Sequence, residues 1–136
     1  MLGEKIGEEQ GKVTGRRVLK AEDPRYLKME VSFEGQTTIF GIQGVDMGTY
    51  TVFERIAGQL YGEGQGIIMT TDGDGVIWNG HGVGRMDANG TMFIAASISY
   101  QTDSAKLSRL NGVLGVIEHQ SDMQGNIRST GYEWKA

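Results

Sequence analysis

The residues whose spacing most suggests a chemical site are the glycines of residues 61–86, YGEGQGIIMTTDGDGVIWNGHGVGRM. They recur at every second position on either side of one turn, as Gly62, Gly64, Gly66 and then Gly80, Gly82, Gly84. A glycine loop that holds a phosphate lies instead between a strand and a helix, with the spacing GxGxxG or with a lysine that reaches the phosphate. The chain has neither feature here, so we expect no nucleotide and no other cofactor.

Few side chains offer metal chemistry. The chain has no cysteine, which excludes thiolate zinc sites, catalytic cysteines and disulfides. His81 and His119 are the only histidines, and with Glu63 or Glu118 they would make a two-histidine, one-carboxylate site only if separate strands converged. No local spacing enforces that convergence. We therefore interpret both histidines as surface residues and predict no metal site.

The sequence TDGDG at 71–75 resembles the start of a calcium-binding loop. The twelfth position of that loop is Val83, where calcium binding requires a glutamate, so we interpret the segment as a hairpin turn. Serines are common, but none lies in the strand–turn–helix setting of a nucleophile elbow. The catalytic residues, if there are any, stay unknown at this level.

In the segments that must position these residues, apolar side chains recur at every second position. In RYLKMEVSFEG, the apolar residues Leu27, Met29, Val31 and Phe33 alternate with polar ones, which is typical of a half-buried strand. Segments of the same kind follow at 36–45, 48–55, 61–69, 76–86, 90–101, 112–120 and 126–134, and a weaker one covers 12–19. Turn sequences such as TDGDG, DANG and SDMQGN separate several of them. This spacing predicts an all-β fold, an antiparallel closed β-barrel of about eight strands, as a single domain over residues 1–136.

One segment departs from this period. TDSAKLSRLNG, at 102–112, has Leu107 and Leu110 three residues apart, with Thr102 or Asp103 as a possible cap and Asn111-Gly112 as a stop. It predicts one short helix whose leucines cover an open end of the barrel. The alternative is an irregular loop with two buried leucines.

The two glycine-rich segments should form one hairpin. A loop with an even number of residues would place Glu63 and Gln65 opposite glycines, and His81 and Val83 likewise on the other face. Each bulky side chain would then lie over a bare backbone, which allows the pair to coil into a tightly curved wall. A bulge or an odd loop would instead stack glycine on glycine.

The two faces of this hairpin differ in character. One carries large apolar side chains with one carboxylate and one amide, which suits the lining of a ligand cavity. We therefore predict that it faces inward and that the ligand-binding residues are Tyr61, Glu63, Gln65, Met69 and Trp78. In the alternative interpretation, Glu63 and Gln65 are solvent-facing strand residues.

The runs GEGQG (62–66), GHGVGR (80–85) and SYQTDSAKLSRLNGVLGVIEH (99–119) resemble a group of small bacterial proteins of unknown function and similar length. Those proteins share the barrel of allene oxide cyclase, an antiparallel barrel of about eight strands around a central cavity, often found as oligomers. The resemblance covers most of the chain after about residue 25 and rests on structural glycines and a strand–helix–strand pattern. It implies a fold and a homo-oligomer, but it carries over no activity and no catalytic residue.

Charge and hydropathy limit the classes of partner that the protein is expected to bind. The net charge is −4, and acidic residues interrupt the densest group of basic ones, so we expect no nucleic acid. No apolar run is long enough to span a bilayer, so no membrane partner is expected and a cytoplasmic location is the default. Three functions stay open: binding of a small apolar or amphipathic molecule inside the barrel, an isomerase or cyclase that uses a buried polar group, and a packed barrel that acts as a structural or oligomerising protein.

Overall fold

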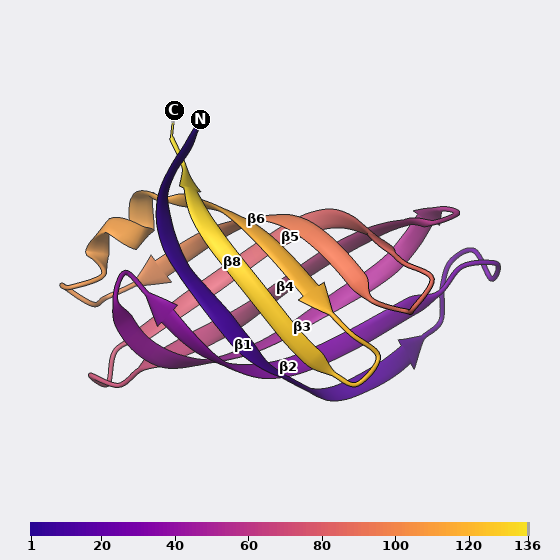
Figure 1. Ribbon diagram of the computed structural model, residues 1–136, viewed down its shortest axis with the longest axis horizontal. Coiled ribbons are helices and arrows are strands. Elements are labelled where there is room, and N and C mark those ends of the chain that lie inside the picture. The colour runs from indigo at the N-terminus through magenta and orange to yellow at the C-terminus, as the bar shows by residue number, and fades with distance from the viewer. Residues whose placement is uncertain (136) are drawn as a thin grey trace.

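The computed structural model describes residues 1–135, which form a closed antiparallel barrel (Figure 1). Each strand pairs with the next along the chain, and β8 returns to β1, so that the two ends of the chain lie side by side. The elements are β1 (Leu2–Leu19), β2 (Lys28–Ile39), β3 (Ile42–Ile56), β4 (Gln59–Thr70), β5 (Gly75–Met86), β6 (Met92–Thr102), η1 (Ser108–Gly112), β7 (Leu114–Ser121) and β8 (Asn126–Trp134). The predicted fold class is confirmed. Within the described residues, no helix is long and apolar enough to cross a membrane.

Three of the hairpins use the same five-residue turn. In each turn the backbone N–H of the first residue donates to the carbonyl of the fifth, and the N–H of the fourth residue donates to the carbonyl of the first. The fourth residue is a glycine with positive φ, a conformation that other residues rarely adopt. This combination is a type I turn followed by a bulge residue. The turns are Thr70–Asp74 with Gly73, Asp87–Thr91 with Gly90, and Asp122–Asn126 with Gly125.

The turn at Gly73 overturns the predicted pairing of β4 with β5. Five residues lie between the partners Met69 and Gly75. Odd-numbered residues of β4 therefore pair with odd-numbered residues of β5, and even-numbered with even-numbered. Gly62 pairs with Gly82 and Gly64 with Gly80, while the side chains of Glu63 and His81 become direct neighbours. Glycine therefore stacks on glycine, and the predicted interleaving is wrong because the bulge glycine adds one residue to the loop.

The glycines permit two strands to approach their neighbours unusually closely. A Cβ atom added to Gly80, Gly82 or Gly84 of β5 would lie 2.2, 2.4 or 2.0 Å from a carbonyl oxygen of β6. At Gly7 and Gly11 of β1 it would lie 1.7 and 2.2 Å from carbonyl oxygens of β2. Because β1 and β5 lie opposite each other in the closed order, these glycines coil the sheet at two opposite sides of the barrel.

Two apolar clusters fill the ends of the interior. One contains Ile6, Ile39, Ile68, Val76, Leu107, Leu110 and Val113, and the other contains Val31, Phe33, Tyr50, Val52, Leu60, Met92 and Ile127. Trp78 packs against both clusters. The central part of the barrel therefore lies between two apolar layers.

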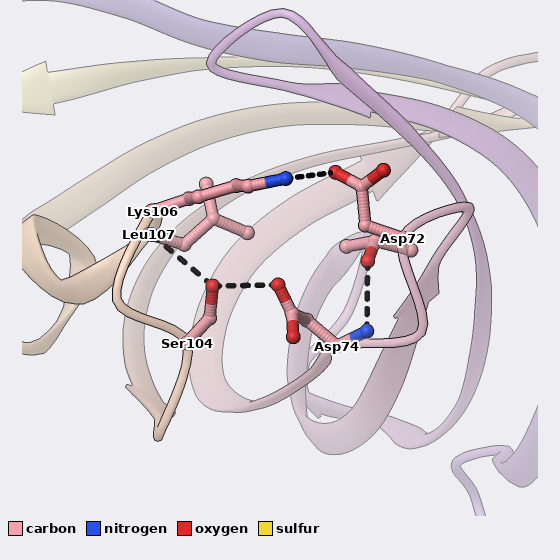
Figure 2. A network of polar contacts seen from close by, with 6 residues as sticks. Asp72, Asp74, Ser104, Lys106 and Leu107 are labelled. Carbon is pink, nitrogen blue, oxygen red and sulfur yellow. Dashed lines mark hydrogen bonds and ion pairs between the residues drawn. The ribbon is translucent and has the colours of Figure 1, made fainter.

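The segment between β6 and β7 closes the end formed by the first cluster. It contains a 3-10 turn, Ser108–Gly112, rather than a longer helix, and neither predicted cap binds it. Instead Ser104 Oγ accepts the N–H of Leu107 and donates to Asp74 in the β4–β5 turn, while Lys106 pairs with Asp72 (Figure 2). Leu107 and Leu110 are almost fully buried, which confirms that they cover this end.

Candidate ligand site inside the barrel

A cavity of about 140 Å³ lies in the barrel interior. Four of the alternating glycines border it, from two neighbouring strands: Gly62, Gly64, Gly80 and Gly82. In front of Gly62 the space is open, since an added Cβ atom would meet nothing closer than 3.6 Å, whereas at Gly64, Gly80 and Gly82 it would clash with atoms of the neighbouring strands. Gly62 therefore leaves interior volume, while the other three glycines permit close packing of the strands.

Four of the five residues predicted to bind a ligand have side chains on the outer surface. Glu63, Gln65 and Met69 are exposed, and the ring of Tyr61 contacts its outer-face neighbours Phe53 and His81. Their predicted inward orientation is wrong, because the inner side of β4 carries Gly62, Gly64 and Ile68. The even-loop pairing places Trp78 on the same face as Glu63 and Gln65, which makes that face resemble a cavity lining. Trp78 does point inward and borders the cavity.

Two carboxyl groups inside the barrel were not singled out in the sequence. Glu9 of β1 and Asp46 of β3 are 8% and 6% exposed, and their side chains hydrogen-bond to each other. Both border the cavity. Glu9 reaches Asp46 by passing over Gly35 of β2, where a Cβ atom would lie 2.7 Å from Glu9 Oε2. A glycine on the strand between them is therefore what lets the two acids meet.

The indole of Trp78 fixes the second acid of this pair. Trp78 Nε1 donates a 2.8 Å hydrogen bond to Asp46 Oδ1. The indole reaches across β4 to β3 because it lies on two bare positions, Gly66 and Gly48, where added Cβ atoms would come within 2.5 and 2.7 Å of the ring. Glycine again supplies the space for a side chain that builds the site.

Burial and mutual repulsion set the protonation of the pair. Burial, followed by the hydrogen bond and the negative charge of Asp46, raises the pKa of Glu9 far above its usual range. Burial also raises the pKa of Asp46, while hydrogen bonds from Glu9 and Trp78 act in the opposite direction. Two carboxylates this close cannot both ionise readily, so the pair holds one proton, which we place on Glu9.

His119 of β7 lies inside the barrel, so the prediction of a surface histidine is wrong for this residue. Its Nδ1 lies 2.7 Å from Ser129 Oγ, and its Nε2 lies 3.5 Å from the hydroxyl of Tyr50. Burial lowers the pKa of His119 to about 4 and raises the pKa of Tyr50 to about 12. Both side chains are therefore uncharged at neutral pH.

These polar groups form one row around the inner wall. Thr37 pairs with Glu9, Glu9 with Ser129, and Ser129 with His119, on four neighbouring strands. His81, by contrast, is exposed on the outer surface. Among residues 1–135, no group of three or more acidic, histidine or cysteine side chains is placed to hold a metal ion.

A sequence signal for the two interior acids does exist. Glu9 stands in Gly7-x-Glu9-x-Gly11 and Asp46 in Gly44-x-Asp46-x-Gly48, so each acid shares a strand face with two glycines. Since the glycine face of β4 and β5 is the inner face, the same pattern on β1 and β3 indicates acids that point inward. Glu9 was not recognised as an interior residue because it lies in MLGEKIGEEQ, a segment whose other charged residues are exposed.

The fold and the cavity define a small closed β-barrel with a partly polar interior. No known protein family and no curated protein matches the sequence. Solved structures do match the fold. A protein of unknown function from Clostridium acetobutylicum superposes with a TM-score of 0.82 at 13% identity, over 97% of this chain and 98% of its own.

Two further structures extend the comparison. A β-barrel-like protein from Acinetobacter baumannii gives a TM-score of 0.83 at 14% identity, over 99% of this chain and 96% of its own. An enzyme from Penicillium herquei gives a TM-score of 0.69 at 14% identity, over 96% of this chain and 92% of its own. At these identities the likeness concerns the fold alone. It supports the predicted resemblance to small barrel proteins of unknown function.

Proposed function

We propose that the protein binds a small, mostly apolar molecule in the interior of the barrel. The observation that carries this proposal is the cavity of about 140 Å³, walled largely by glycines and apolar side chains. An engineered apolar cavity of about 150 Å³ accepts benzene, so a single ring is the matching ligand size. The few polar groups at the wall, Glu9, Asp46 and His119, would orient such a molecule.

Filling the cavity tests this proposal. A Cβ atom on Gly62 would lie 3.6 Å from Thr51 O and 3.8 Å from Ile94 Cδ1, so a side chain can start there and extend into the cavity. Gly75, on the outer face of the neighbouring strand, offers a matched control with no contact closer than 3.8 Å. We expect single-ring compounds such as phenol to raise the Tm of the wild type and Gly75→Leu, and not that of Gly62→Leu.

Two results would count against binding in the cavity. The first is an equal ligand-induced shift in Gly62→Leu, which would place the ligand elsewhere. The second is the absence of any shift in the wild type across a panel of single-ring compounds. A structural role for a solidly packed barrel would then be favoured.

A second candidate is proton transfer by an isomerase or cyclase-type enzyme. The proton-sharing pair of Glu9 and Asp46 at the cavity favours it, since one group can donate a proton while the other accepts one. The pair supplies the buried polar group that this function needs, whereas Glu63 is exposed. The resemblance to allene oxide cyclase belongs to this candidate. Exchange of α-protons of a small ring ketone in D₂O, followed by NMR, should be faster with wild type than with Glu9→Gln; equal rates would reject it.

The homo-oligomer is also a proposal, and the outer surface suggests where copies meet. Exposed or half-buried apolar side chains adjoin one another on β3, β4 and β5: Val45, Met47, Ile67, Met69 and Ile77. A closed barrel has no free strand edge, so copies would pack through a face. Light scattering coupled to size-exclusion chromatography should give a multiple of the 14.8 kDa chain mass that Ile77→Lys reduces. A wild-type monomer would contradict it.

A further inference from the structure

The wall of the cavity combines aromatic rings with buried acidic side chains. Four aromatic side chains border it: Phe33, Tyr50, Trp78 and Tyr100. The only ionisable acids with buried side chains there are Glu9 and Asp46, and no lysine or arginine of the described chain borders the cavity. Two histidines border the cavity: the side chain of His81 is exposed on the outer surface, and His119 is uncharged at neutral pH because burial lowers its pKa to about 4.

Extending the proposed function, we infer that the cavity takes a small organic cation, an amidinium or ammonium group attached to one ring. Its charged group would lie against the carboxyl groups of Asp46 and Glu9. Its apolar part would lie between the aromatic side chains and the glycine wall. The inference rests on the proposed interior binding site and adds the charge of the ligand to it.

Three features of the wall favour a cation over a neutral or anionic ligand. The face of an aromatic ring carries partial negative charge and attracts a cation, most strongly in tryptophan. A planar amidinium presents two N–H donors that match the oxygens of a carboxylate. An anion would meet two buried acids and no compensating positive charge, so its desolvation would be unopposed.

The arrangement of the aromatic side chains supports the same ligand class. The ring of Phe33 lies 6.0 Å from that of Tyr50 and 6.3 Å from that of Trp78, so the three rings pack against one another at the wall. The Trp78 indole also donates to Asp46, which links this aromatic group directly to the acid. A ligand at the carboxylate would therefore lie beside aromatic side chains.

The groups that face the acid pair come from several strands, and none is cationic at neutral pH. Thr37 lies on β2, Trp78 on β5 and Tyr100 on β6, and the negative charges of Asp46 and Glu9 help burial to raise the pKa of Tyr100. The pair retains a proton because no positive group neutralises both acids. A bound monocation would neutralise the single negative charge that the pair carries, while the proton stays on Glu9.

Three probes of one shape and different charge separate the outcomes: benzamidinium, benzamide and benzoate, measured by calorimetry at pH 7. We expect benzamidinium to bind at least about tenfold more tightly than benzamide, and benzoate to bind weakest. Benzamide or benzoate binding as tightly as benzamidinium would overturn the inference and leave the proposed function intact. Failure of all three probes to bind would overturn both.

Asp46→Asn tests the role of the acid. The asparagine oxygen can still accept the Trp78 N–H, so the site keeps its shape while losing its charge. Benzamidinium affinity should fall at least about tenfold, while benzamide affinity changes by less than about twofold. Glu9→Gln, which keeps the neutral, donating form of Glu9, should change benzamidinium affinity by less than about twofold. If Asp46→Asn does not fold, the comparison of the three probes on the wild type still decides the charge preference. The exposed Glu34→Gln on β2 is the control, and equal loss in that variant would reject a role for the buried pair.

Discussion

The side chain of Glu9 crosses the bare backbone of Gly35, where an added Cβ atom would lie 2.7 Å from Glu9 Oε2. Gly35 belongs to β2, the strand that separates Glu9 on β1 from Asp46 on β3. The glycine therefore decides whether two acids on next-nearest strands can share a proton. Gly35 contributes no functional group to the site; it contributes the space through which the Glu9 side chain passes.

Gly35→Ala should separate the two acids. The new methyl group would occupy the path of the Glu9 side chain, which must turn away and leave Asp46 buried without its partner. We expect a loss of about 1–3 kcal/mol in the free energy of unfolding, measured by urea denaturation. Gly15→Ala on β1 is the control, because nothing lies within 4 Å of its added Cβ atom. Equal stabilities of the two variants would mean that Glu9 has another route to Asp46.

Glu9→Gln should change how stability depends on pH. The unfolded chain loses the Glu9 proton above its ordinary pKa of 4.5, whereas the folded protein keeps it because the pKa of Glu9 is raised. Unfolding therefore releases a proton, and rising pH above about 4.5 favours the unfolded state. Glutamine does not titrate, so the variant should gain stability relative to wild type from pH 5 to pH 9, as urea denaturation would measure. A difference that stays constant with pH would show that Glu9 ionises normally in the folded protein.

The sequence was sufficient for the fold class because most strands, several turns and the covering leucines have local signals, although the predicted strand 36–45 spans the β2–β3 turn and residues 2–11 of β1 were missed. Alternation identifies a half-buried strand, and Gly73, Gly90 and Gly125 mark turns that need positive φ. Leu107 and Leu110 stand out because their spacing breaks the period of two. None of these inferences depends on residues distant in the chain.

The site could not be predicted in the same way, because it depends on two long-range facts. Whether Gly73 acts as a bulge changes the loop by one residue, and one residue exchanges the two faces of β5 relative to β4. The contact between Glu9 and Asp46 joins residues far apart in sequence, across an intervening strand. The glycines that flank each acid were visible, but their face could be assigned only once the register was known.

Ser104→Ala tests the covering segment shown in Figure 2. Ser104 Oγ donates a 2.8 Å hydrogen bond to Asp74 and accepts the N–H of Leu107 at 3.3 Å, in a buried setting. Losing both bonds should lower the free energy of unfolding by about 1–3 kcal/mol and speed hydrogen exchange at Leu110 and Val113. Lys106→Ala removes only an exposed ion pair and should cost less than about 1 kcal/mol. A larger loss of stability from Lys106→Ala than from Ser104→Ala would mean that the exposed ion pair, and not the buried hydrogen bonds, holds the segment in place.

His119 should limit stability in acid. The unfolded chain binds a proton on this residue below its ordinary pKa of 6.5, while the folded protein resists protonation until about pH 4 because the imidazole is buried. Stability is therefore lost as pH falls from 6.5 toward 4, by up to about 3 kcal/mol.

His119→Gln isolates this effect, because glutamine can keep a hydrogen bond to Ser129 and does not titrate. Urea denaturation at pH 7, 5.5 and 4.5 should show the wild type losing stability relative to the variant as the pH falls. His81→Gln, a change of the exposed histidine, should follow the wild-type curve throughout. Parallel curves for wild type and His119→Gln would mean that the interior imidazole accepts a proton as readily as it does in water.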